Sequence, residues 1–87
     1  MVSKNVTVVN AEGFHMRPAA LFAGEMGKFR SEVIIEFKNK RINAKSPMNI
    51  IAACIKCGAE ISINCDGEDE SAALEKAVSM IEAGLGE

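Results

Sequence analysis

Apolar residues recur at two different spacings along this chain of 87 residues, and the alternation between the two spacings constrains the fold more than any other feature. Alternating polar and apolar residues predict four strands, each with one buried face: 2–9, 33–37, 41–44 and 61–65. Apolar residues three or four positions apart predict three helices: 16–27, 47–57 and 70–83. The order β-α-β-β-α-β-α predicts a two-layer α+β fold, with helices on one face of a sheet and water on the other.

Local signals mark several of the predicted boundaries. Ser46 and Pro47 are of the types preferred at the N-cap and the first position of a helix, and Gly58 is placed for a left-handed C-cap. Asn39 tolerates a positive φ and fits a tight turn between the second and third strands. Asp69 is the predicted N-cap of the last helix. These short connections leave no room for a linker, so we predict a single domain over residues 1–87.

Composition disfavours several classes of function. A net charge of -2 and four Phe without Tyr or Trp argue against nucleic-acid binding. No stretch approaches the roughly 18 apolar residues of a membrane span, so no membrane association is expected. A chain of this length can hardly enclose a cofactor pocket and keep a core, so no cofactor is expected. Three cysteines are too few for a disulfide framework, and free thiols without an apolar leader favour a cytoplasmic location.

The only histidine, His15, lies just before the first predicted helix. Backbone N–H groups at that helix end have no partner within the helix, and the positive end of the macrodipole is there, so the position suits an anion. Arg17 adds a positively charged guanidinium group, which can donate paired hydrogen bonds to phosphate oxygens. An imidazole beside such a cradle can act as the nucleophile that forms a phosphohistidine. The residues alone equally fit a surface histidine that only caps a helix. No second ligand lies at helical spacing from His15, so no metal site is predicted.

Cys54 and Cys57 have the spacing of a redox or zinc motif. A thioredoxin-type pair opens a helix, whereas this pair falls at a predicted helix end, and zinc would need further ligands beyond Cys65. The pattern therefore favours small core and helix-end residues over a functional pair.

Two separated segments together resemble one known family. Gly13-Phe14-His15-Met16-Arg17-Pro18-Ala19 resembles the active-site segment of HPr, the histidine-containing phosphocarrier of the bacterial sugar phosphotransferase system. Asn43-Ala44-Lys45-Ser46-Pro47-Met48, followed by Gly58-Ala59-Glu60-Ile61, resembles the regulatory-serine region of that family. The tail at residues 84–87 resembles Gram-positive members. The likeness runs the whole length of the chain.

The resemblance implies an open-faced β-sandwich, in which three helices cover one face of a four-stranded antiparallel sheet. It also implies that His15 accepts phosphate on Nδ1 from phosphorylated enzyme I and passes it to the enzyme IIA domain of a sugar permease. Arg17 would balance the charge of the phosphate. The protein would then be a carrier, not an enzyme that turns over alone.

The same resemblance implies control at Ser46 by HPr kinase/phosphorylase, linked to carbon catabolite repression. Pro47 replaces the aliphatic residue usual beside that serine. An alternative function is an HPr-like regulatory protein that acts through phospho-Ser46 and a catabolite-control transcription factor rather than in sugar uptake. Relatives that only regulate lack the active-site histidine, so His15 favours the carrier.

A carrier must expose its site to several partners in turn. We therefore predict an apolar contact patch where the first two helices begin, in a protein that acts as a monomer. Its predicted members are Phe14, Met16, Ala20, Met48 and Ile51.

Overall fold

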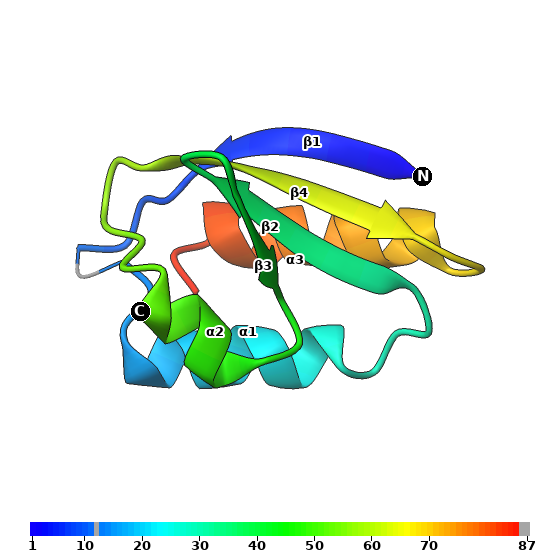
Figure 1. The fold of residues 1–87 in the computed structure, drawn as a ribbon, viewed down its shortest axis with the longest axis horizontal. Coiled ribbons are helices and arrows are strands. Elements are labelled where there is room, and N and C mark those ends of the chain that lie inside the picture. Colours follow the sequence, from blue (N-terminus) through cyan, green and yellow to red (C-terminus); the bar gives the residue numbers. More distant parts are fainter. Residues whose placement is uncertain (12, 86–87) are drawn as a thin grey trace.

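Four strands form one antiparallel sheet in the order β1-β4-β2-β3 in the computed structural model of the protein, which describes residues 1–11 and 13–85. The strands are β1 (Val2–Thr7), β2 (Glu32–Phe37), β3 (Lys40–Asn43) and β4 (Glu60–Asp66). The helices are α1 (Met16–Met26), α2 (Pro47–Ala52) and α3 (Glu70–Glu82), and they cover one face of the sheet (Figure 1). The predicted α+β architecture and element order are confirmed. The end of the tail segment, residues 86–87, lies outside the described residues.

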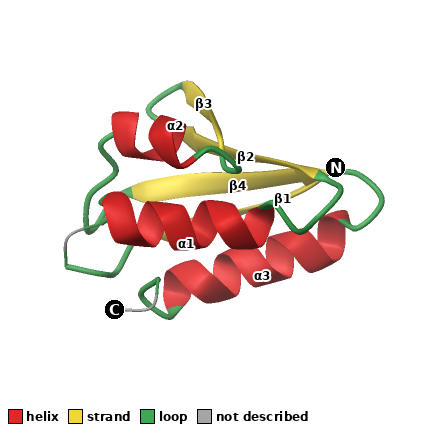
Figure 2. Cartoon of the chain, turned by 90° about the horizontal axis from the view of Figure 1, so that it is seen from below, coloured by secondary structure: helices red, strands yellow, loops and turns green. Residues whose placement is uncertain are grey.

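The core fills the space between the sheet and the helices. Figure 2 shows α1 and α3 side by side beneath the sheet, while α2 lies on the side of β3. Strand residues on the helix-facing side are buried, and so are the inward residues of the helices. The largest fully buried side chains are Phe22, Met26, Ile35, Ile50, Ile55, Ile63, Ile81 and Leu85. The opposite face of the sheet is polar, and on it Asn64 Nδ2 donates to Glu36 Oε1 at 2.6 Å.

The hairpin between β2 and β3 has a two-residue loop. Lys38 and Asn39 both have a positive φ, 50° and 66°, and Phe37 pairs with Lys40 across the end of the ladder. Two left-handed residues in succession match the right-handed twist of the flanking strands. The tight turn predicted at Asn39 is therefore present, and Lys38 shares its conformation.

The second helix is shorter than the sequence predicts. It begins after Ser46 as expected, but α2 ends at Ala52, and the left-handed residue after it is Cys54 with φ 56°. Gly58 does have a positive φ of 87°, yet it lies in the turn before β4, where its N–H donates to the Val8 carbonyl at 2.7 Å. The helix ends early because the chain must turn to place Ile55 in the core, where it is 2% exposed. Tertiary packing here overrides local helix propensity.

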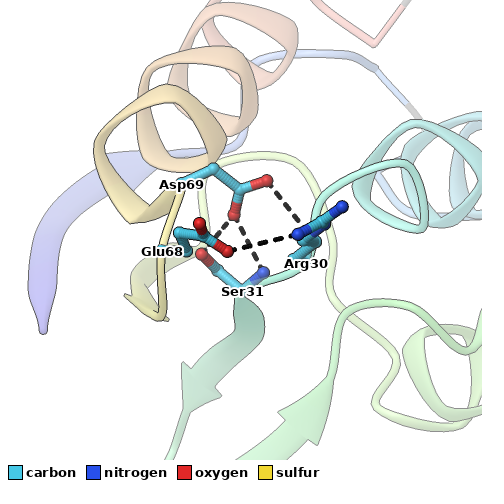
Figure 3. Close-up of polar contacts among 4 residues, drawn as sticks. All are labelled: Arg30, Ser31, Glu68 and Asp69. Atoms are coloured by element: carbon cyan, nitrogen blue, oxygen red, sulfur yellow. Dashed lines mark hydrogen bonds and ion pairs between the residues drawn. The ribbon is translucent and has the colours of Figure 1, made fainter.

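Asp69 begins α3, but its side chain does not cap that helix. Its backbone carbonyl accepts from the Ala73 N–H at 3.0 Å, while its carboxylate reaches the segment before β2 (Figure 3). There it accepts hydrogen bonds from the backbone N–H groups of Arg30 and Ser31, both at 2.9 Å, and from the Ser31 hydroxyl. The hydrogen bond from Ser31, followed by that from Arg30, lowers the pKa of Asp69 to about 2. The carboxylate thus ties the start of α3 to the start of β2.

We expect Asp69→Asn to lower the thermal unfolding midpoint near neutral pH, because the amide offers one acceptor oxygen where the carboxylate offers two. The folded-state pKa of about 2 lies below the ordinary value of 3.8, so the carboxylate stabilises the fold fully above about pH 4. That contribution is lost as the pH falls through about 2. The difference in midpoint between variant and wild type should therefore shrink over this range, as followed by circular dichroism. A difference in midpoint that is the same at about pH 4 and at about pH 2 would contradict this stabilising role of the Asp69 carboxylate.

Candidate functional site

The loop that leads into α1 is held by a buried asparagine. Asn10 Nδ2 donates to the Gly13 carbonyl at 2.5 Å, and the Gly13 N–H donates to the Asn10 carbonyl at 3.1 Å. Asn10 is 6% exposed. The sequence indicates only a turn at this point and does not predict the fixing role of Asn10. An asparagine three residues before a glycine is the local signal that accompanies it.

Gly13 packs directly against the segment between α2 and β4. Its φ is +66°, and an added Cβ would lie 2.6 Å from the Lys56 Cα and in still closer contact with the Ile55 carbonyl oxygen. The next residue, Phe14, donates its N–H to that Ile55 carbonyl at 2.9 Å. The loop is therefore positioned by residues more than forty positions further along the chain.

Phe14 is buried, which corrects its predicted place in an exposed apolar patch. It is 3% exposed, and its ring packs edge-on against Phe22 with the centroids 5.4 Å apart. The physical reason is that Phe14 is fixed on both sides, through its N–H to Ile55 and through its ring to α1. It anchors the residue that follows it.

His15 occupies the N-cap position of α1, as predicted. Its backbone is extended, with φ -83° and ψ -171°, and its carbonyl accepts from the Ala19 N–H at 3.0 Å. The residue is half-buried, and its imidazole makes no capping hydrogen bond to the helix. The ring therefore does not serve as the helix cap that the alternative interpretation of the sequence requires.

The first turn of α1 provides the surroundings expected of an anion site. Met16 and Arg17 are its first two residues, and their N–H groups have no acceptor within the helix. Pro18 follows and supplies no N–H, which costs nothing in a first turn. Arg17 is exposed. His15 is thus followed within two residues by the free N–H groups and the positive end of α1 and by the guanidinium of Arg17.

Ser46 caps α2 with its side chain, as predicted. Its Oγ accepts from the Asn49 N–H at 3.4 Å, its carbonyl accepts from the Ile50 N–H at 3.2 Å, and Pro47 takes the first helical position. Ser46 is half-buried and Pro47 is exposed. A structural role for the serine is therefore established, and its modification stays a prediction.

The other predicted patch residues lie on the two helices that pack against each other, α1 and α2. Met16 and Met48 stand in the first turns of their helices with 74% and 72% of their surfaces exposed. Ala20 is exposed and Ile51 is half-buried. Leu21, which the sequence analysis does not include, is also exposed.

Cys54 and Cys57 are not core residues, which corrects one part of the prediction from their spacing, whereas Cys54 does lie at the end of α2, just after its C-cap residue. Both are exposed free thiols that follow α2, whereas Cys65 on β4 is buried. They are exposed because the helix ends at Ala52 and Ile55 takes the buried position between them.

No group of three or more His, Cys, Asp or Glu side chains that could hold a metal ion occurs among residues 1–11 and 13–85. Within the same ranges, no helix is long and apolar enough to span a membrane.

Residues 2–83 match the profile of the family described as "PTS HPr component phosphorylation site". The chain belongs to the HPr family. It is 42% identical over 82 residues to the HPr-like protein Crh of Halalkalibacterium halodurans, which covers 94% of this chain and 98% of that protein. It is also 42% identical over 74 residues to the phosphocarrier protein HPr of Treponema pallidum, which covers 85% of this chain and 84% of that protein.

Solved HPr structures share the whole fold. A structure of HPr from Thermoanaerobacter tengcongensis has a TM-score of 0.95 and 37% identity, and covers 100% of this chain and 98% of that one. HPr of the same organism has also been solved as a dimer, at a TM-score of 0.79 with both chains fully covered. The HPr family thus includes phosphocarriers as well as the HPr-like protein Crh, and its phosphocarriers are carriers rather than catalysts.

Proposed function

We propose that this protein is a phosphoryl carrier in which His15 is the acceptor. A ring nitrogen of His15, Nδ1 by likeness to the family, attacks the phosphorus carried by enzyme I. The new nitrogen–phosphorus bond forms as the bond to enzyme I breaks, and the reverse process at an enzyme IIA domain regenerates the imidazole. The observation that carries the proposal is the position of His15 at the N-cap of α1, with Arg17 two residues further on in the first turn of the helix.

Incubation with enzyme I and phosphoenolpyruvate tests this function. The expected product is one acid-labile phosphate per chain, located on His15 by mass spectrometry and identified as a nitrogen–phosphorus bond by phosphorus NMR. A reaction without enzyme I is the control and should yield none. Phosphate found only on a hydroxyl would contradict the proposal.

Arg17 is expected to act on transfer rather than on folding, because it is exposed and lies outside the buried stripe of α1. A hydrogen bond to a charged group contributes about 1.5–3 kcal/mol. Arg17→Ala should therefore slow phosphorylation of His15 roughly 10- to 100-fold. The transfer rate and the unfolding midpoint are measured together. Normal transfer, or slow transfer explained by an unfolded variant, would count against this role.

The contact surface for enzyme I and for enzyme IIA domains is proposed to be an apolar patch of Met16, Ala20 and Met48 with the half-buried Ile51. The exposed methionines can repack against different partners because the side chain is flexible. Transfer at His15 uses residues of one chain, so a monomer in the cytoplasm is sufficient for this function.

A second candidate function is regulatory, and the likeness to the HPr-like protein Crh favours it. In this function Ser46 is phosphorylated by HPr kinase/phosphorylase, and the modified protein binds a catabolite-control transcription factor. Both functions can coexist in one chain. The presence of His15 distinguishes this protein from relatives that only regulate.

The regulatory function depends on whether a kinase accepts Ser46 beside Pro47. A kinase assay that compares this protein with Pro47→Ile is the test, because proline removes the N–H next to the target residue. We expect phosphorylation of both proteins, since the Ser46 side chain already faces the amides of the first turn, where a phosphate gains from the dipole by about 0.3–1 kcal/mol. If only the variant reacts, Ser46 is a structural cap and the regulatory function fails.

Phosphate at Ser46 should also reduce transfer to His15. It would place negative charge next to the apolar patch that enzyme I must desolvate. Ser46→Asp is the mimic, and we expect it to lower the rate of phosphorylation by enzyme I without unfolding the domain.

A further inference from the structure

Cys54 and Cys57 lie together on one surface depression. The depression is lined by the segment between α2 and β4 and by the end of the β2–β3 hairpin. The Cys54 Sγ lies 3.8 Å from the Ala52 carbonyl oxygen, and the Cys57 Sγ lies 3.7 Å from that of Val9. A thiol is a weak donor, so these contacts do little to hold either sulfur in place. Both are exposed, and exposure is what thiol–disulfide exchange requires.

The chain between the two cysteines is short and bent. Cys54 has a left-handed backbone with φ 56°. The chain turns again just after Cys57, where Gly58 has φ 87° and the Ala59 N–H donates to the Lys56 carbonyl at 3.0 Å. A disulfide needs Cα atoms within about 7 Å of each other. Three residues of chain span at most about 11 Å when fully extended, and a bent segment spans less. The short spacing thus limits how far apart the two Cα atoms can lie, and closing the bond requires the loop to hold them within the disulfide limit.

The charges around the depression suit an anionic disulfide reagent. Lys38 and Lys56 line it together with Glu60, which leaves an excess of positive charge. Low-molecular-weight disulfides of the glutathione class carry carboxylates, and such a field raises their local concentration. The third cysteine, Cys65, is buried and therefore differs from the exposed pair. Its burial is the main cause that raises the pKa of its thiol, and the negative charges of Glu70 and Asp69 raise it further.

The same loop holds the phosphoryl-acceptor segment. Ile55 and Lys56 lie between the two cysteines, and Phe14 donates its N–H to the Ile55 carbonyl at 2.9 Å. Gly13 approaches the same two residues so closely that a methyl group would not fit. A change in the backbone between the cysteines is therefore passed directly to the residues before His15.

We propose that Cys54 and Cys57 form a reversible dithiol–disulfide pair that controls the loop carrying His15. One thiolate attacks a low-molecular-weight disulfide, which gives a mixed disulfide and releases one small thiol. The second cysteine then displaces the other small thiol as the internal sulfur–sulfur bond forms. Two protein thiols are oxidised and one disulfide is reduced to two thiols. The effect on phosphoryl transfer rests on the function proposed above, whereas the bond itself does not.

The bond is tested on the full chain with oxidised glutathione, followed by alkylation under denaturing conditions and mass spectrometry. The expected product has lost two hydrogens, bears one alkyl group at Cys65, and regains all three thiols with dithiothreitol. Cys54→Ser and Cys57→Ser are the matched controls and should stop at the mixed disulfide. Wild-type protein that gives only mixed disulfides, linked dimers or unchanged thiols would overturn the proposal.

The control of the loop is tested by comparing reduced and oxidised protein. Hydrogen exchange at the Phe14 amide should be at least about fivefold faster after oxidation, which is the effect of losing about one net hydrogen bond. Phosphorylation by enzyme I should slow by a similar factor, and neither serine variant should show the change. An oxidised protein with unchanged exchange at Phe14 would overturn the control of the loop. If enzyme I fails to phosphorylate even the reduced protein, the proposed carrier function fails, while thiol counts and amide exchange still decide this inference.

Discussion

His15→Ala is expected to abolish acid-labile phosphorylation by enzyme I. The chain contains one histidine, so no other imidazole can accept the phosphate. Phosphate on a hydroxyl such as that of Ser46 is stable to acid, so acid treatment separates the two modifications. The loss should be complete within the sensitivity of the assay, because the substitution removes the nucleophile itself.

The fold should tolerate this substitution. The imidazole makes no capping hydrogen bond to α1, so the substitution does not remove a helix cap. Circular dichroism and the unfolding midpoint provide the control, and Ser46→Ala provides a variant at the N-cap of α2 that should still be phosphorylated at His15. Acid-labile phosphate on the folded His15→Ala protein would mean that another residue is the acceptor.

The sequence predicts the element order because the apolar spacing changes cleanly between strands and helices. It also locates His15 and Ser46 at helix starts, since Pro18 and Pro47 fit only the first turn of a helix. It fails at the end of α2, because no helix-breaking residue occurs between Ala52 and Gly58. There the chain turns in order to bury Ile55, and that requirement comes from the rest of the fold.

The errors at the site have the same origin. Phe14 is predicted to be exposed because a carrier must present its site to several partners. In the structure its ring packs against Phe22 and its N–H bonds to the Ile55 carbonyl, so the side chain is buried. Away from the site, the partner of the Asp69 carboxylate lies 38 residues away at Ser31, beyond the reach of any local pattern. Sequence reasoning thus places His15 at the start of α1 and misses the contacts that hold the residues before it.

Those contacts lead to the second large effect, which is expected for Gly13→Ala. The added Cβ would meet the backbone of Ile55 and Lys56, at 2.6 Å from the Lys56 Cα, and backbone atoms cannot rotate aside as a side chain can. The φ of +66° adds a cost of about 1–2 kcal/mol for alanine. We expect a total loss of more than about 2 kcal/mol, which for a domain of this size lowers the unfolding midpoint by roughly 10 °C or more.

Gly24→Ala is the matched control for this prediction. Gly24 lies in α1 with open space where the alanine Cβ would stand, so the same chemical change there should raise stability by about 0.5–1 kcal/mol. If the unfolding midpoint falls in Gly13→Ala and rises in Gly24→Ala, the loss of stability in the first variant is caused by the contact with residues 55–56 and not by the loss of a glycine. Transfer to His15 should fall in Gly13→Ala even at temperatures where the protein is folded, because relief of the clash separates Phe14 from the Ile55 carbonyl. A variant that unfolds at the wild-type midpoint with a protected Phe14 amide would show that the loop is not positioned by this contact.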